Sequence, residues 1–363
     1  MNRREFLGTA AGVAALGALP RDAFAAAEFD PKPGAWRGYA VTTTLDIRKQ
    51  SGPVTAWMPL PSIAEADWIA PEGDEWHGDA AVAEVVIDPP SGARILRAEF
   101  PAEIATPRLT IVSRFRARDR GDVLDATGAA PLSPEARARY LAATHLMPTD
   151  GIVKETAERI TAGAATDLAK ARAIYEWVVD NTERVAEVRG CGIGDVASML
   201  ESGDLGGKCA DLNALYVALA RASGVPARDL YGIRVAPSAF GYKSLGAGSE
   251  VITKAQHCRA EVFLDGPGWV PVDPADVRKV VLEEPPGDNA LDSAVVTAAR
   301  AKLFGAWEGN WMAYNDAHDV VLPGSDHRVA FLMYPQAEVA GALVDCLDAP
   351  TFAYAIKAAP ITT

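Results

Sequence analysis

Short runs in which apolar and polar residues alternate dominate the chain from residue 36 to residue 118. Such runs are typical of strands that bury one face, and turns rich in proline and glycine separate them. The clearest runs cover residues 39–45, 54–58, 84–87 and 109–115. We therefore predict an N-terminal all-β domain over residues 36–118, with a sandwich-like arrangement of its strands.

The apolar spacing becomes helical in the next part of the chain. Ser133 and Pro134 favour a helix start, because serine caps free N–H groups and proline loses no hydrogen bond there. Helical runs follow at residues 153–160, 168–179 and 210–222, and strand-like runs return at residues 261–264 and 269–272. Together they predict an α+β core.

These patterns predict three further segments. Residues 119–132 lack any period and are expected to be a linker, and residues 133–285 form the core. We expect residues 286–363 to be a C-terminal extension that packs on the core. Its aromatic residues Trp307, Trp311 and Tyr314 would shape access to a cleft or bind a partner.

The first 25 residues resemble a twin-arginine export signal. Arg3 and Arg4 precede an apolar stretch that ends at Leu19, and Ala-Phe-Ala at residues 23–25 is typical of a cleavage site. We expect cleavage after Ala25 and a periplasmic or otherwise exported protein. The apolar stretch, about 12 residues long, is too short for a stable membrane span. A disordered or amphipathic tail is the alternative interpretation.

The amino-acid composition argues against some classes of function. The 363 residues include 48 Asp and Glu against 35 Lys and Arg, a net charge of −13, which argues against nucleic-acid binding. A hydrophobic fraction of 49% supplies enough apolar material for about two folded domains. The four cysteines, in an exported chain, leave open disulfide pairing or a free catalytic thiol.

Cys209 is the leading candidate for a reactive group. It follows two glycines and Lys208 and stands at the start of the helical run 210–222. Free N–H groups and the helix dipole at such a position lower a thiol pKa, and the same N–H groups can stabilise an oxyanion. Lys208 would add to the effect, and the glycines would let a substrate approach closely.

A nucleophilic thiol needs a base and a group that orients the base. Of the five histidines, His257 alone stands at the head of a predicted strand that leads into a hairpin. Asp273 ends the return strand of this hairpin. With a four-residue loop at 265–268, Leu264 would face Trp269, and Asp273 would face Ala260 rather than His257. A bulge, another register or strand twist must then close the gap.

Three motifs in this order and spacing resemble the bacterial transglutaminase-like superfamily, whose fold is papain-like. They are GKCADLNAL at residues 207–215 with GVPAR at 224–228, HCRAEV at 257–262, and GWVPVDP at 268–274. The resemblance covers residues 150–285. It implies a triad of Cys209 as nucleophile, His257 as general base and Asp273 as orienter, with no cofactor and no metal. It departs at Arg259, where many relatives carry an aromatic residue.

These observations predict an exported thiol enzyme that hydrolyses amide or peptide bonds through a thioester. Its partners would be a peptide or protein amide substrate and an envelope protein. A catalytically inactive binding or assembly module of the cell envelope is the alternative from another class. A thiol redox protein is less favoured because no CxxC is present, and a zinc site at Cys191, Cys209, His257 and Cys258 lacks the usual ligand pairs.

Overall fold

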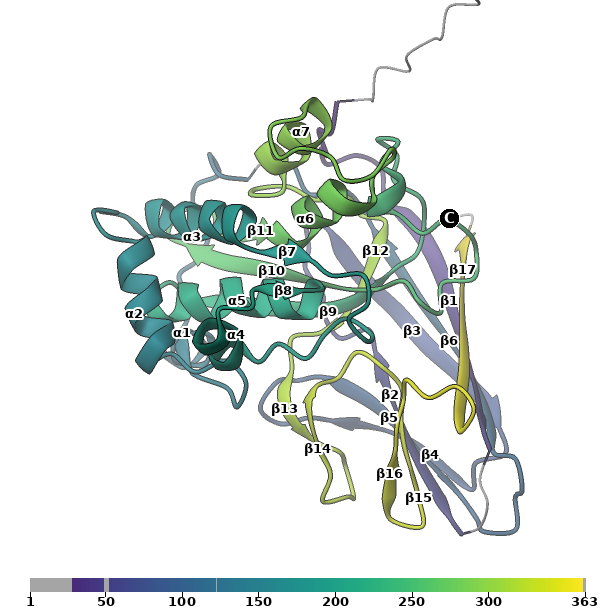
Figure 1. Cartoon of the computed structure of the whole chain (residues 1–363). Coiled ribbons are helices and arrows are strands. Elements are labelled where there is room, and N and C mark those ends of the chain that lie inside the picture. The colour runs from purple at the N-terminus through teal and green to yellow at the C-terminus, as the bar shows by residue number, and fades with distance from the viewer. Residues whose placement is uncertain (1–27, 49–51, 122, 362–363) are drawn as a thin grey trace, which may run out of the picture.

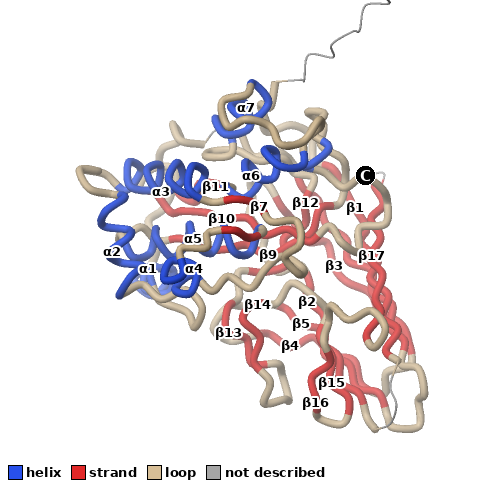
Figure 2. The backbone as a smooth tube through the Cα atoms, viewed as in Figure 1, coloured by secondary structure: helices blue, strands red, loops and turns tan. Residues whose placement is uncertain are grey.

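A computed structural model describes residues 28–48, 52–121 and 123–361. The predicted export signal lies outside these residues. Helices gather around one sheet at one end of the molecule, and two further sheets form the other end (Figure 1; Figure 2). Among the described residues, no helix has the length and apolar character needed to cross a membrane. The predicted α+β class is confirmed.

The N-terminal part is a sandwich of two antiparallel sheets, as the alternating pattern predicts. Its strands are β1 (Arg37–Ile47), β2 (Val54–Leu60), β3 (Ile69–Gly78), β4 (Val82–Ile87), β5 (Arg94–Phe100) and β6 (Arg108–Ala117). One sheet has the order β17-β1-β6-β3, and the other β16-β15-β2-β5-β4. The inward-facing residues of both sheets, such as Leu45, Met58 and Phe100, form a shared core.

Three of the C-terminal strands complete these two sheets: β15 (Gln336–Val339), β16 (Ala342–Val344) and β17 (Phe352–Ile361). β13 (His318–Val321) and β14 (Arg328–Phe331) pair with each other in a separate two-stranded sheet. β17 pairs with β1 along its length, and β15 pairs with β2. The segment 286–363 is therefore divided between the core and the sandwich, because β1 and β2 would otherwise leave a row of backbone groups without partners.

The core consists of a four-stranded antiparallel sheet in the order β11-β10-β9-β12 with helices around it. The strands are β9 (Ala227–Arg234), β10 (Gln256–Leu264), β11 (Gly268–Val272) and β12 (Trp311–Asn315). The helices are α1 (Pro134–Leu141), α2 (Gly151–Ile160), α3 (Asp167–Asn181), α4 (Val196–Ser202), α5 (Cys209–Ala222), α6 (Pro274–Glu283) and α7 (Ala294–Lys302). Short elements are β7 (Glu183–Arg184), β8 (Gly206–Gly207) and the 3-10 helix η1 (Lys243–Leu245).

The helix starts and the central helix follow the sequence prediction. The Ser133 hydroxyl accepts a hydrogen bond from the N–H of Ala136 at 3.2 Å, and Pro134 opens α1. α5 is buried on all sides from Cys209 to Arg221, because it packs between the sheet and helices α2, α3 and α6. The most buried helix of the core therefore carries the candidate nucleophile at its first position.

The segment 119–132, which we expected to be a linker, is anchored to the core by a buried charge network. Arg120 pairs with Glu261 of β10 and donates to the carbonyl of Trp269 at 2.5 Å. Arg228 of β9 donates to the other oxygen of Glu261 at 2.6 Å. Each of these three charged side chains is buried. The network therefore connects the end of the sandwich to the sheet of the core.

We predict that Glu261→Gln destabilises the protein by about 3–5 kcal/mol, because it leaves two guanidinium groups buried without a counter-charge. Burial by itself raises the pKa of Glu261, but Arg228 and Arg120 more than offset this effect and lower it. The stabilisation is therefore present at neutral pH and is lost as the pH falls below the ordinary glutamate value.

Denaturant unfolding at pH 7 measures the effect. Glu75→Gln is the matched control, since Glu75 pairs with Arg114 in an exposed position and should change the free energy of unfolding by less than about 1 kcal/mol. Equal effects of the two substitutions would contradict the prediction.

Candidate active site

The start of α5 is fixed by the side chain of Asp211, two residues after Cys209. One carboxylate oxygen accepts the N–H of Lys208 at 2.9 Å. The other accepts the N–H groups of Ile193 and Gly194, each at 2.9 Å. The N–H of Ala210 donates to the carbonyl of Cys191 at 2.9 Å. Asp211 therefore holds the loop at residues 190–195 against the helix N-terminus and fixes the backbone of Cys209.

Two glycines are required for this arrangement. A Cβ at Gly192, whose φ is +89°, would lie 1.7 Å from an Asp211 carboxylate oxygen. A Cβ at Gly207 would lie 2.6 Å from the Cβ of Asp211. The sequence suggested that glycine before Cys209 admits a substrate backbone. The structure gives Gly207 a different reason, which is close packing against the capping aspartate.

The hairpin β10–β11 has a different register from the one expected. Its loop contains three residues rather than four, so that Leu264 pairs with Gly268 and Ala260 pairs with Val272. With this one-residue shift, the next pair in the register is Asp273 opposite Arg259. Asp273 then lies on the same face of the sheet as Arg259 and His257. Gly268 makes the shorter loop possible, because its φ is +79°. The predicted facing of Asp273 and Ala260 is therefore wrong, and the gap closes without a bulge.

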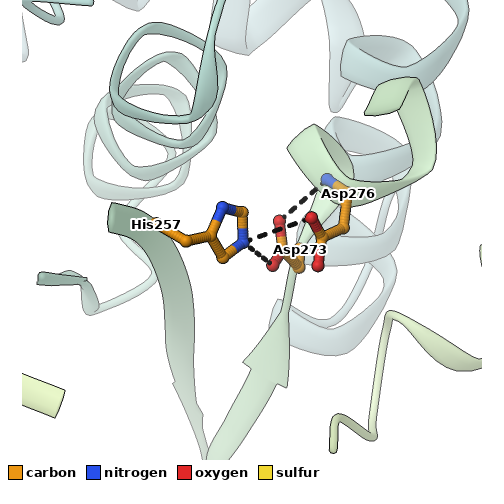
Figure 3. Close-up of side chains that lie close together, drawn as sticks. All are labelled: His257, Asp273 and Asp276. Atoms are coloured by element: carbon orange, nitrogen blue, oxygen red, sulfur yellow. Dashed lines mark hydrogen bonds and ion pairs between the residues drawn. The ribbon is translucent and has the colours of Figure 1, made fainter. Parts of the chain in front are cut away.

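His257 lies between two carboxylates (Figure 3). Its Nε2 is 2.8 Å from an oxygen of Asp273 and 3.3 Å from an oxygen of Asp276. Asp276 also accepts a hydrogen bond from Arg234 at 2.5 Å. Because Nε2 is engaged with the carboxylates, Nδ1 faces away from them and is free to interact with a thiol.

Sequence reasoning missed Asp276 and Arg234, although a signal for the aspartate exists. Asp273 and Pro274 form the start of α6, where Asp273 accepts the N–H of Asp276 at 3.0 Å. An acidic residue three positions after an N-cap is favoured near the positive end of a helix. Arg234 had no comparable signal, because only the strand pairing brings it to the site.

Opposing effects set the protonation of His257. Burial and Arg234 lower its pKa, but Asp276 and Asp273 more than offset them and raise it from 6.5 to about 9. The pKa of Cys209 shifts well below its ordinary value of 9.0. Interactions with the thiols of Cys191 and Cys258 lower it most, burial opposes them, and His257 lowers it further. The arrangement therefore favours a thiolate beside an imidazolium at neutral pH.

Cys191 and Cys258 lie beside Cys209, and all four cysteines are free thiols in the structure. Interaction with Cys209 raises the pKa of Cys191, and burial raises that of Cys258. Both therefore stay protonated beside the Cys209 thiolate, and the Cys191 thiol donates to the backbone carbonyl of Gln256 at 3.4 Å. Cys258 also contacts the thioether of Met333 at 3.9 Å.

Two residues support His257 from behind. Trp311 donates to the backbone carbonyl of His257 at 3.1 Å. Arg259 stacks against Trp307 and Trp311 and lies 3.8 Å from Asp273. Trp307 and Trp311 are fully buried. They therefore support the site from within and do not shape access to a cleft, which is the role that the sequence suggested.

A pocket of about 610 Å³ opens above Cys209 and His257. Its lining comes from the segment before α5, from the residues that lead into β10, and from the C-terminal residues Phe352 and Tyr354. Asp273 is fully buried beneath the pocket and does not line it. The thiol and the imidazole are thus accessible to a ligand of peptide size, while the carboxylates stay protected from water.

Among the described residues, one group of side chains has the spacing of a metal site. The ligand atoms of His257, Asp273 and Asp276 lie within 4.8 Å of one another. These atoms already interact with each other and with Arg234, whose positive charge occupies the place of a counter-ion. This group of side chains therefore suits a histidine that two carboxylates orient better than it suits a bound cation.

Comparison with known proteins agrees with this geometry. The model of the transglutaminase-like superfamily matches residues 154–274, which include Cys209, His257 and Asp273. An uncharacterized protein of Haemophilus influenzae is 36% identical over 335 residues, or 87% of this chain and 89% of that protein. The chain belongs to one family with this protein, and its central part is a transglutaminase-like domain.

The chain is also similar to solved structures at low sequence identity. A candidate cysteine protease from Cytophaga hutchinsonii is 13% identical, covers 91% of this chain and 92% of its own, and has a TM-score of 0.52. The periplasmic domain of TgpA from Pseudomonas aeruginosa is 15% identical over 68% of this chain and 90% of that chain, with a TM-score of 0.34.

We predict that Cys191→Ala raises the pKa of the Cys209 thiol by about one unit, because the neighbouring thiol that lowers this pKa is lost. The pH dependence of Cys209 alkylation, followed by peptide mass spectrometry, measures this pKa. Cys346→Ala is the control, since Cys346 interacts with Gln336 rather than with Cys209. A pKa that is the same in both variants and the wild type would contradict the role of Cys191.

Proposed function

We propose that this protein is an exported thiol-dependent acyl-transfer enzyme, a hydrolase of amide or peptide bonds. Cys209 is the nucleophile, His257 the general base and acid, and Asp273 the orienting carboxylate. The observation that carries the proposal is the buried imidazole with raised pKa beside a thiol with lowered pKa, both opening into one pocket. Perturbed pKa values of this kind concentrate at catalytic sites.

The chemistry proceeds in two steps. The Cys209 thiolate attacks the amide carbonyl carbon, the His257 imidazolium gives its proton to the leaving amine, and the C–N bond breaks. The product is a thioester on Cys209. Neutral His257 then takes a proton from water, which attacks the thioester, and the carboxylic acid leaves as the thiolate forms again. The N–H of Cys209, at the first position of α5, has no acceptor within the helix and suits the oxyanion.

Water is the proposed acceptor of the acyl group, because the pocket is open to solvent. The proposed location is the periplasm or another exported compartment, and its support is the leader-like sequence of residues 1–25. An envelope protein is a proposed partner. A catalytically inactive envelope module with the same fold is the outcome that the following experiment distinguishes.

We expect Cys209→Ala to abolish cleavage of a library of internally quenched peptides, and Asp273→Asn to slow it at least about 100-fold, since the imidazole loses its orienting charge. The wild type should also form a thioester at Cys209, detected by intact mass after acid quenching. Cys346→Ala should retain activity. A folded wild type that cleaves nothing and forms no adduct would support the inactive module.

The pH dependence of thioester formation gives a second test. The reactive pair exists above the pKa of Cys209 and below that of His257, which lies near 9. The rate of acylation should therefore be constant around neutral pH and fall as the pH rises through about 9. An acylation rate that keeps rising up to pH 10 would show that a neutral imidazole and an ordinary thiol react instead.

A further inference from the structure

The charges that line the pocket differ from those of the whole chain. The protein has a net charge of −13, yet no Asp or Glu of the described part of the chain lines the pocket. Six lysine and arginine residues do: Arg184, Arg189, Lys208, Arg234, Lys254 and Lys279. A cleft with walls of low dielectric concentrates the field of such charges on its contents.

Four of these six cations already have partners. Arg234 pairs with Asp276, and Arg189 pairs with Asp345 at an exposed position. Arg184 and Lys279 both interact with Glu283, which itself does not line the pocket. One carboxylate thus neutralises two cations, and a positive charge is left on this wall.

Lys208 and Lys254 have no ion-pair partner among the residues that the structure describes. Lys208 directly precedes the nucleophile, and Lys254 lies three residues before His257 on the exposed edge. The two ammonium groups therefore approach the pocket from the two segments that carry the thiol and the imidazole. A bound anion would be their counter-charge.

The pocket lining also includes apolar residues. Phe352, Leu347 and Tyr354, all from the C-terminal part, line it together with the exposed Val251. A ligand that suits this lining carries carboxylates and an apolar side chain. A peptide supplies both together with the amide carbonyl that Cys209 would attack, whereas an inorganic anion has no apolar part.

We infer that the acyl donor of this pocket is an acidic peptide, whose carboxylates lie against Lys208 and Lys254 and whose apolar side chain lies against Phe352 and Leu347. This substrate class rests on the proposed function, but the charge preference of the pocket exists whether or not the thiol is catalytic. The proposed function and the charge preference of the pocket can therefore fail independently.

Binding to the Cys209→Ala protein tests the charge preference without catalysis. The probes are three fluorescein-labelled hexapeptides that share a phenylalanine and carry two glutamates, two glutamines or two phosphoserines. We expect the glutamate peptide to bind at least about 10-fold more tightly than the glutamine peptide at low salt, with the difference shrinking at 0.5 M salt. Equal binding of the two would overturn the inference, and binding of the phosphoserine peptide alone would overturn the carboxylate assignment.

Variants of the two lysines test whether the charge preference arises in the pocket. Lys208→Met and Lys254→Met, each combined with Cys209→Ala, should reduce the glutamate advantage by about fivefold each, as expected for a unit charge about 4 Å away in a solvated pocket. Lys154→Met is the matched control, because Lys154 lies on α2 outside the pocket, and it should leave the advantage unchanged. A loss in the control equal to that in the pocket variants would assign the effect to net charge alone.

Alkylation of the wild type separates this inference from the proposed function. Iodoacetate and iodoacetamide differ in charge and react with the same thiol. The ratio of their rates at Cys209 should fall about threefold in Lys208→Met and stay constant in Lys154→Met. If Cys209 reacts with neither reagent below pH 8 while the glutamate peptide still binds selectively, the proposed function fails and the acidic-peptide site stands.

Discussion

A chain of buried charges connects the parts of this site. Arg234 pairs with Asp276, Asp276 and Asp273 flank the imidazole of His257, and each of these groups is buried. A single charge in such a place would be strongly destabilising, and the set is tolerated because each member has a partner of opposite sign. The network therefore fixes the relative positions of β9, β10 and the start of α6.

The nucleophile depends on a second, neighbouring constraint. Asp211 satisfies the free N–H groups around the start of α5 and holds the preceding loop against the helix. This brings Cys191 beside Cys209, where its protonated thiol stabilises negative charge on sulfur. Since the helix itself is buried between the sheet and three other helices, the thiol is held in place from below and reaches solvent only through the pocket.

The sequence predicted those features that depend on local chemistry. Helix α1 begins at a serine and a proline because these residues satisfy or avoid free N–H groups, and α5 begins where glycines precede an apolar helical run. Features that depend on distant segments were not predictable. β9 is buried at each position, so it lacks the alternating pattern of a half-exposed strand, and β17 finds its partner β1 across the whole chain.

In the candidate site, too, the features that depend on local sequence were predictable and those that depend on tertiary packing were not. Cys209, His257 and Asp273 came from motifs along the chain, and the structure brings His257 and Asp273 within 2.8 Å. The expected four-residue loop placed Asp273 on the wrong face, because one residue in a hairpin loop reverses the side of every following side chain. Arg234 and the pocket lysines belong to the site through tertiary packing alone, which a single sequence does not reveal.

The most direct test of this account is the titration of His257 by ¹⁵N NMR, in the wild type and in Asp276→Asn. The account predicts an imidazolium at pH 7 with a pKa near 9 in the wild type. The pKa should be lower in the variant, because a carboxylate that raises it is lost while Arg234, which lowers it, remains. A neutral imidazole at pH 7 in the wild type, or a titration unchanged by the substitution, would contradict the charged thiolate–imidazolium pair.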